Sequence, residues 1–464
     1  MHAPPPASSI HGLSWFAIIR IGLVQAAIGG MVMLTTTVLN RLMVVEYALA
    51  AAIPAGLVGW HYAVQLCRPL WGHGSDNAAH EGAGKGGGRA KWIMGGLIVL
   101  ALGALLAIHV TLTTADSFWT GLALGILAYT LIGIGVGAGG TSALALLASG
   151  VAPQRRAAAA AVTWIMMIAG IVASAITVSA LIDPFSPERL WWVSLGLLGT
   201  CLTVAALATF RLEPRVPFAF EETAKTDAPP SFRNAIAEIM AEKAARRFTI
   251  FIFASMMAFN MQDLILEPFA GLVFGMTPGE STGLGGMQSG GVLAGMIVSG
   301  IGGSAFAGRM PVELRHWIVF GCLGSALALA GLAVGATFGA GWPIHANVFA
   351  LGFCNGLFAV AAIGAMMGLA GSGENTREGV RMGVWGAAQA VAFGLGGLVG
   401  ALGVDFARTA FGADGPAFQL VFAAEGALFV VAAWLAIRAT AKGLSGQSTS
   451  PRQNMTEKEA GIFA

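Results

Sequence analysis

Charged side chains are scarce in this sequence, and their scarcity excludes several classes of protein. Of the 464 residues, 10% are charged and 56% are hydrophobic, and the formal net charge is only +2. A protein that binds nucleic acid needs a concentrated excess of Lys and Arg, whereas the 25 basic residues here are spread over many short polar stretches. We therefore expect no nucleic-acid partner and a chain whose solvent is mostly membrane lipid.

Cysteine is also scarce, and the motifs of several enzyme classes are absent. None of the four cysteines, Cys67, Cys201, Cys322 and Cys354, stands at the spacing of a metal site. There is no HExxH and no GxSxG pattern. A GxGxxG match at 135–140 lies inside an apolar segment and follows no strand, so it does not indicate a dinucleotide site. We predict no catalytic residues and no metal site made of protein side chains alone.

Long apolar runs make up most of the chain. Twelve segments are each long enough to cross a bilayer core as a helix, which takes about 20 apolar residues. They span residues 15–39, 50–68, 92–112, 118–148, 158–182, 190–211, 247–271, 283–306, 316–338, 344–370, 382–404 and 416–437. The sequence therefore predicts an all-α membrane protein with twelve transmembrane helices.

The positive charges between these segments fall almost entirely on one side. Of the 25 Lys and Arg residues, only Arg41, Arg189 and Arg408 lie at ends reached after odd-numbered crossings, and the other 22 lie on the opposite side. Because basic residues mark the cytoplasmic side, both termini are predicted to be cytoplasmic. Residues 1–14 carry neither a basic region nor a cleavage site, which indicates an uncleaved inner-membrane protein.

The two halves of the sequence are related by an offset of 221 residues. It pairs Glu46 with Glu267, Gly135 with Gly356, Gly150 with Gly371, Arg156 with Arg377 and Trp164 with Trp385. Two parallel six-helix repeats are the arrangement of major facilitator superfamily transporters, whose binding site lies between the halves. We predict a cytoplasmic tail at 1–14, an N-terminal half at 15–211, a cytoplasmic loop at 212–245, a C-terminal half at 246–438 and a cytoplasmic tail at 439–464.

Polar side chains within or beside apolar segments are costly, so each is a candidate functional group. Two clusters related by the repeat are predicted to form ion pairs at a gate or cavity on the non-cytoplasmic side: Asn40, Arg41 and Glu46, and Gln262, Asp263 and Glu267. Asp263 and Glu267 share a helix face, where two carboxylates repel unless a cation, a proton or an Arg compensates. We expect Arg41 to be their partner, in a structural salt bridge or in proton coupling or substrate recognition.

Three side chains of the second and third segments can ligate a tetrapyrrole. His61, with Gln65 one turn later, and His109 present imidazole or amide groups that can ligate a central Mg²⁺ if they face a cavity. The alternative, that each histidine hydrogen-bonds a neighbouring helix, stays open.

Two blocks of sequence carry a resemblance to a known family. They are LNRLMVVEYALAAAIPAGLVGWHYAVQLCRPLWGHGSD at 39–76 and QDLILEPFAGLVFGMTPGEST at 262–282. Through them the chain resembles the PucC family of photosynthetic bacteria, a branch of the major facilitator superfamily named for light-harvesting complex assembly. The sequence of these two blocks is most similar to the branch of the family that is labelled as a bacteriochlorophyll synthase chain. The family residues carried over are Asn40, Arg41, Glu46, His61, Arg68, Gly72, Asp76, Gln262, Asp263, Glu267, Pro268 and Glu280.

The stretch RPLWGHGSD resembles the superfamily loop between the second and third helices. There a Gly allows a tight turn, and an Asp pairs with Arg to latch the cytoplasmic side. By this resemblance Arg68, Gly72, Asp76 and Arg89 form a cytoplasmic latch. The stretch 77–91 departs from the motif by a longer, Gly-rich insertion.

The resemblance implies a membrane assembly factor for light-harvesting complexes that is not an enzyme. In the inner, intracytoplasmic photosynthetic membrane it would handle bacteriochlorophyll or a precursor. Its partners would be membrane lipid, nascent antenna polypeptides, chlorophyll synthase or other assembly factors. The alternative is a secondary transporter of a tetrapyrrole or another amphipathic molecule. A coupled transporter needs a titratable group in its cavity, and we expect the acidic residues, apart from Glu425, to cluster at helix ends, which favours assembly.

The distribution of basic residues generates a test of topology. A reporter that is active only outside the cytoplasm should be active when fused at residue 278 or 412 and silent when fused at 228, because 22 of the 25 basic residues place the latter in the cytoplasm. Reporter activity in whole cells measures this. Activity at 228 would show that the number of crossings is wrong.

Overall fold

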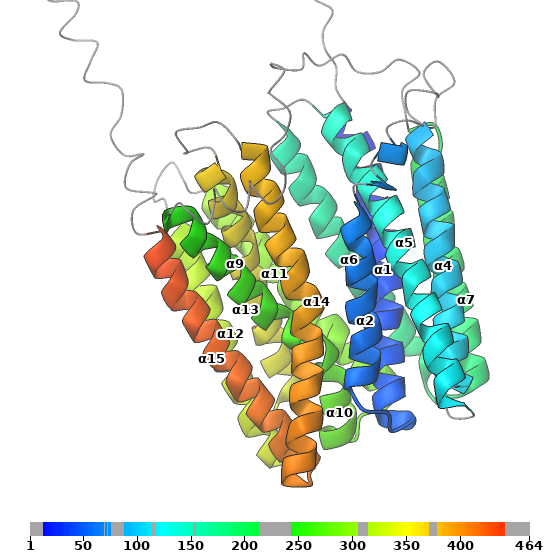
Figure 1. Cartoon of the computed structure of the whole chain (residues 1–464), viewed down its shortest axis with the longest axis vertical. Coiled ribbons are helices and arrows are strands. Elements are labelled where there is room, and N and C mark those ends of the chain that lie inside the picture. The colour runs from blue at the N-terminus through cyan, green and yellow to red at the C-terminus, as the bar shows by residue number, and fades with distance from the viewer. Residues whose placement is uncertain are drawn as a thin grey trace, which may run out of the picture.

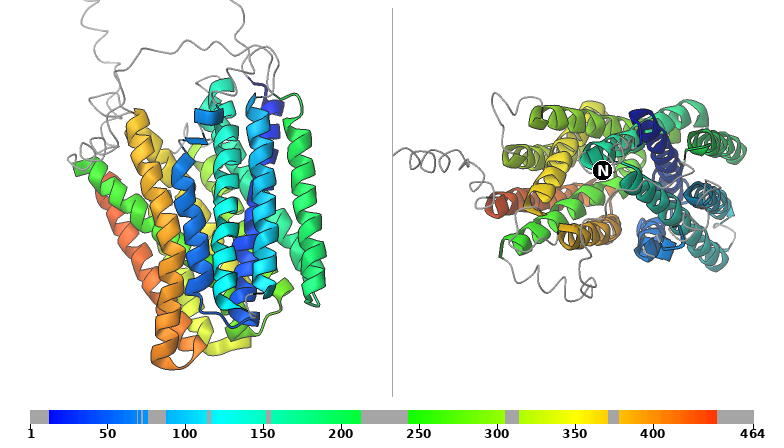
Figure 2. Two further views of the ribbon diagram at one scale, coloured as in Figure 1. Left: turned by 45° about the vertical axis from the view of Figure 1, so that its right-hand side comes forward. Right: turned by 90° about the horizontal axis from the view of Figure 1, so that it is seen from above.

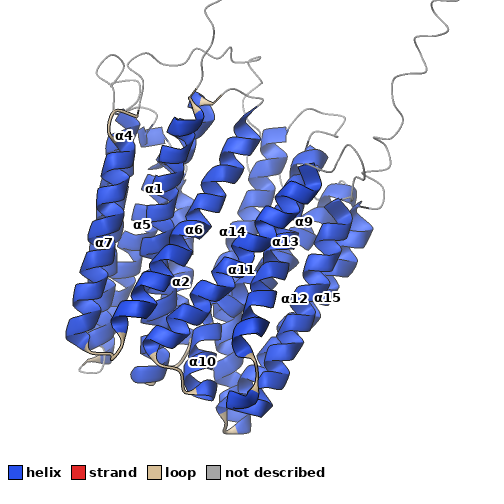
Figure 3. Cartoon of the chain, turned by 180° about the vertical axis from the view of Figure 1, so that it is seen from behind, coloured by secondary structure: helices blue, strands red, loops and turns tan. Residues whose placement is uncertain are grey.

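The computed structural model describes residues 13–68, 70–71, 73–75, 88–113, 117–151, 155–212, 243–304, 314–370 and 378–440. In this part of the chain the secondary structure is helical and contains no strand (Figure 1, Figure 3). The predicted all-α class is therefore confirmed.

The helices of the first half begin with one long rod. It consists of α1 (Trp15–Met33) and two π-helical stretches, η1 (Leu34–Leu39) and η2 (Leu42–Glu46). The first segment, expected to end at residue 39, therefore continues to Glu46. The other elements are α2 (Ala52–Val64), η3 (Gln65–Cys67), α4 (Gly88–Thr113), α5 (Phe118–Gly150), α6 (Arg156–Ile182) and α7 (Pro187–Thr209).

The helices of the second half begin with a broken rod. Its parts are α9 (Lys243–Met261), the short turn η5 (Gln262–Leu264) and α10 (Leu266–Phe274), and the bend between its two arms is 40°. The remaining elements are α11 (Pro278–Ser304), α12 (Leu314–Phe338), η6 (Gly339–Gly341), α13 (Ile344–Ala370), α14 (Glu378–Phe411) and α15 (Asp414–Thr440).

Most of these helices can cross a membrane. Nine in the described part of the chain are long and apolar enough, and ten if the broken rod counts as one span. The predicted segments outside this set form α2, which has 13 residues, and the Gly-rich α11. The number of twelve crossings and the cytoplasmic location of both termini therefore stay predictions.

The helices form two groups, each with its own buried hydrophobic core. One core is built mainly from α1 to α7 and the other from α9 to α15, and the end-on view in Figure 2 shows the groups on opposite sides. Between the groups, α2 packs on α14 and α6 packs on α11. The 221-residue offset carries α6 onto α14 and α2 onto the start of α11, so the two interfaces are related by the repeat.

Close helix packing rests on glycines at repeat-related positions. A Cβ atom at Gly135 would lie 2.5 Å from the backbone nitrogen of Leu100 in α4, and one at Gly356 would overlap the carbonyl oxygen of Val292 in α11. Lipid supplies no hydrophobic drive between helices, so backbones that approach this closely gain stability from packing.

Candidate functional site between the two halves

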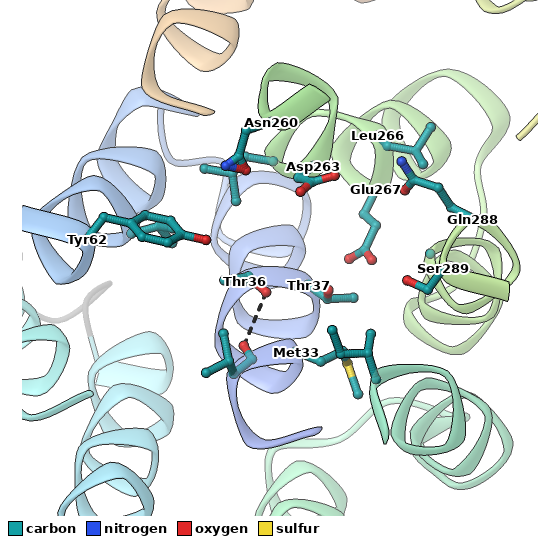
Figure 4. A pocket seen from close by; sticks show the side chains of 15 residues that line it. Met33, Thr36, Thr37, Tyr62, Asn260, Asp263, Leu266, Glu267, Gln288 and Ser289 are labelled. Atoms are coloured by element: carbon teal, nitrogen blue, oxygen red, sulfur yellow. Dashed lines mark hydrogen bonds between the residues drawn. The ribbon is translucent and has the colours of Figure 1, made fainter. Parts of the chain in front are cut away.

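A polar cavity of about 170 Å³ lies between the two groups of helices (Figure 4). Both halves contribute to its lining: Val32, Met33, Thr36, Thr37, Val58, Tyr62, Ile171, Asn260, Asp263, Leu264, Leu266, Glu267, Gly285, Gln288 and Ser289. Figure 4 shows the carboxylate of Glu267 directed toward Thr37 and Ser289, with Asp263 beside it. Two of the predicted site residues therefore share one cavity.

The break in the broken rod turns these two carboxylates into the cavity. Pro268 lies in the first turn of α10, where its missing N–H cannot donate to the carbonyl of Leu264, four residues earlier. That carbonyl instead accepts a hydrogen bond of 2.8 Å from the side-chain amide of Asn40, which belongs to the first half. Asp263 and Glu267 thus lie at helix ends, as expected, and they also line a cavity, so their position at helix ends does not count against a titratable group in the cavity.

The side chain of Arg41 is buried and has a different partner from the one expected. Its Nη1 lies 2.7 Å from Oε1 of Glu46, and its Nη2 donates to the carbonyl oxygen of Met276 at 2.6 Å. Arg41 and Glu46 are five residues apart in a π-helical stretch, where positions i and i+5 fall on one face. Among the described residues, Glu46 is the carboxylate within ion-pair distance of Arg41, and Arg41 acts on Glu267 only through longer-range electrostatics.

Two carboxylates that the sequence interpretation missed join the halves at this end of the molecule. Asp405 of α14 accepts hydrogen bonds of 2.9 and 2.8 Å from the backbone N–H groups of Ala51 and Ala52, where α2 begins. Asp183, after α6, accepts from the hydroxyl of Thr277 and from the N–H of Gly279, where α11 begins. Each carboxylate caps the N-terminus of a helix in the other half. The two positions are 222 residues apart, one more than the repeat offset. This near-match to the repeat is the feature of the sequence that could have pointed to the pair.

The start of α11 also shows a structural role for Glu280, one of the residues carried over from the family resemblance. The side chain of Glu280 accepts from the N–H of Thr277 at 2.9 Å, and the hydroxyl of Thr277 accepts from the N–H of Glu280 at 3.2 Å. This reciprocal pair is a capping box, with Pro278 at the first helical position. It holds Thr277 beside Asp183.

The histidines and the amide predicted to bind pigment have other partners or surroundings in the structure. His61 is 2% exposed, its Nδ1 lies 2.6 Å from the carbonyl oxygen of Val58, and it is not among the residues that line the central cavity. The amide oxygen of Gln65 accepts from the guanidinium of Arg68. His109 lies on the exposed face of α4. Ligation of a tetrapyrrole by these side chains stays a prediction.

The predicted cytoplasmic latch lies only partly in the described chain. Gly72 and Asp76 are outside the described residues, so their contacts with Arg68 and Arg89 stay predictions. The guanidinium of Arg89, at the start of α4, donates to the hydroxyl of Ser149 near the end of α5. This end of α4 is therefore tied to α5.

A second cavity of about 320 Å³ opens on the outer surface of the first half. Its lining is mainly apolar and consists of Trp71, Lys91, Trp92, Gly95, Gly96, Val99, Ile134 and Ala138. We call it the α4–α5 groove. It combines two indole rings and one ammonium group with a floor of small residues.

The sequence matches one family over most of its length. The family model described as PUCC protein matches residues 38–443. The chain belongs to the PucC family. It is 50% identical over 425 residues to the "Bacteriochlorophyll synthase 44.5 kDa chain" of Rhodobacter capsulatus, covering 91% of this chain and 95% of that protein. It is 30% identical over 443 residues to "Protein PucC" of the same organism, covering 92% of each.

Solved structures of transporters share the fold. A bacterial homolog of the human lysosomal transporter Spinster, in an inward-facing and unoccupied conformation, gives a TM-score of 0.68 at 14% identity, covering 94% of this chain and 99% of that chain. The nucleoside transporter NupG gives a TM-score of 0.61 at 16% identity, covering 92% and 98%. At these identities the likeness concerns the fold alone. The PucC family protein thus has the major facilitator fold and is a multi-pass protein of the bacterial inner membrane.

The ion pair of Arg41 generates a prediction about stability. Because Glu46 is the direct partner of Arg41, the losses caused by Arg41→Ala and Glu46→Ala should be non-additive by at least about 0.5 kcal/mol. The losses of Arg41→Ala and Asp263→Ala should instead add to within about 0.5 kcal/mol. Denaturant unfolding of the purified protein in micelles measures both cycles. Coupling to Asp263 without coupling to Glu46 would contradict the assigned pairing.

Proposed function

We propose that this protein is an assembly factor for light-harvesting complexes, which handles bacteriochlorophyll or a precursor and delivers it to nascent antenna polypeptides in the photosynthetic membrane. The observation that carries the proposal is the similarity to the "Bacteriochlorophyll synthase 44.5 kDa chain" at 50% identity over nearly the full length of both proteins. Membership of the PucC family supports the same role.

The proposed role is that of a binding partner of the pigment and of the proteins around it. The likeness of the fold to transporters supports a non-catalytic role, and the sequence carries none of the enzyme motifs considered above. Antenna polypeptides, chlorophyll synthase and other assembly factors are the partners that we propose.

The α4–α5 groove is the better candidate for contact with the pigment. Pockets for drug-sized ligands have volumes of roughly 300–1,000 Å³, and the central cavity of about 170 Å³ falls below this range. The groove of about 320 Å³ lies within it and opens on the surface. A flat, apolar macrocycle stacks well on indole rings such as those of Trp71 and Trp92. Pigment that dissolves in the membrane reaches such a groove sideways from the lipid.

Deletion of the gene tests the proposed role. The amount of assembled antenna complex should fall several-fold while pigment-synthesising activity in isolated membranes stays largely intact, because delivery rather than synthesis is lost. Absorption spectra of the membranes and an assay of the synthase measure the two quantities. Loss of synthase activity with an unchanged ability to assemble supplied pigment would contradict the proposal.

Filling the groove tests where the pigment binds. A Cβ atom at Gly95 meets no atom within 4 Å, so Gly95→Leu should fill the groove without a clash and reduce the bacteriochlorophyll that co-purifies with the protein several-fold. Gly196→Leu on α7 is the matched control, because a Cβ atom there also meets nothing within 4 Å. The absorption spectrum of each purified variant gives the pigment content. Equal pigment in both variants would contradict a site in the groove.

A second candidate function is secondary transport of a tetrapyrrole or another amphipathic molecule. The observation that favours it is the pair of carboxylates, Asp263 and Glu267, in a cavity between the halves, where coupled transporters carry their titratable groups. A deletion strain that assembles normal antenna but fails to move a tetrapyrrole across sealed vesicles would favour this function over assembly.

A further inference from the structure

Acidic side chains gather at the central cavity without a directly paired basic side chain among the described residues. Asp263 and Glu267 line it, and Glu425 of α15 lies close enough to Asp263 for the two carboxyl groups to interact electrostatically. Glu267 is 3% exposed and Glu425 is fully buried. An isolated charge buried in a membrane protein is unstable unless a partner, a proton or a bound cation compensates it.

Arg41 and Arg68 make their direct hydrogen bonds with groups other than the cavity carboxylates, and Arg41 reaches Glu267 only through longer-range electrostatics. Arg41, from the first half, pairs with Glu46 and donates to the carbonyl of Met276. Arg68, at the end of η3, donates to Gln65 and interacts electrostatically with the hydroxyl of Tyr62, which lines the cavity. Within the described residues, no Lys or Arg lies at ion-pair distance from Asp263, Glu267 or Glu425.

One buried polar atom that lines the cavity, and several of nearby residues outside its lining, have no hydrogen-bond partner. The lining atom is Oε2 of Glu267, whose carboxylate points into the cavity in Figure 4. Both amide atoms of Gln262, which is fully buried beside Asp263, and both carboxylate oxygens of Glu425 are also without a partner. Unpaired buried polar atoms are rare in folded proteins, and a bound water or ion is one way in which such atoms gain a partner.

We propose that the cavity is a binding site for a monovalent cation, held between the carboxylates of Asp263 and Glu267, with the cation supplied either as an alkali ion or as a proton. Neutral oxygens of Thr36, Thr37 and Ser289 surround the two carboxylates. The volume of about 170 Å³ is that of roughly six water molecules at about 30 Å³ each, which suits a small ion with part of its hydration shell.

Two further features select a monovalent cation. No group of three or more His, Cys, Asp and Glu side chains in the described chain is placed to hold a metal ion, whereas divalent ions take several carboxylates. The broken rod also resembles the discontinuous helices whose unwound turns hold coupling ions between the halves of transporters. The site goes beyond the assembly role, and its test does not involve antenna or pigment.

Thermal unfolding of the purified full-length protein tests the site. Tm is measured in choline chloride from mildly acidic to mildly alkaline pH, and again with sodium or potassium chloride in place of choline. Wild-type Tm should fall by several degrees as pH rises in choline, since loss of the protons leaves uncompensated buried charge. If sodium or potassium chloride restores the Tm at alkaline pH, the bound cation is an alkali ion. If neither salt reverses the fall in Tm, the bound cation is a proton.

The control variants separate this site from the rest of the protein. In the double variant Asp263→Asn with Glu267→Gln, Tm should no longer depend on pH or on alkali ions in this way. Glu188→Gln, on the exposed first turn of α7, should behave like the wild type. A wild type whose Tm depends on pH and alkali ions no more than that of the double variant would overturn the proposal.

A readout on the wild type alone covers the case in which the double variant does not fold. The infrared C=O band of protonated carboxyl groups should be present in choline at neutral pH if the cation is a proton, and alkali ions should shift the carboxylate bands if it is an alkali ion. Absence of both signals would also overturn the proposal.

Discussion

The two halves are held together at one end by carboxylates that cap helices across the interface. The first N–H groups of α2 and α11 have no acceptor within their own helices, and the membrane offers little water to replace one. Asp405 and Asp183 accept from them instead. Figure 1 shows the helices converging toward this end, where α10 lies.

The strength of this closure suits a reversible contact. A single helix cap contributes about 1 kcal/mol, and the bonds from Asn40 to Leu264 and from Arg41 to Met276 add amounts of similar size. A total of a few kcal/mol is within the range that a ligand can shift by binding one conformation more tightly than another. The same contacts therefore hold the halves together and allow them to separate.

The sequence predicted the features that depend on composition and order along the chain. Hydropathy located the helices because lipid demands apolar segments, and the 221-residue offset anticipated the relation of α6 to α14. It did not predict the partner of Arg41, because that depends on the π-helical continuation to Glu46. It did predict a gate or cavity at Asp263 and Glu267, but not the break before Pro268 or the approach of Asn40 across the interface that turn the two carboxylates into it.

The two cavities differ in what motion of the halves can do to their contents. The α4–α5 groove is built within the first half, so a ligand in it travels with that half and stays on the same side of the membrane. The central cavity is lined by both halves, so rearrangement at the interface changes the side from which its contents are reached. In the proposed function, a pigment in the groove would pass laterally to a neighbouring protein, whereas a cation between Asp263 and Glu267 would be affected by any movement of the halves. The two proposed activities, pigment handling and cation binding, thus fall in separate places in one fold, and of the two proposed sites only the central cavity lies where occupancy can bias the arrangement of the halves.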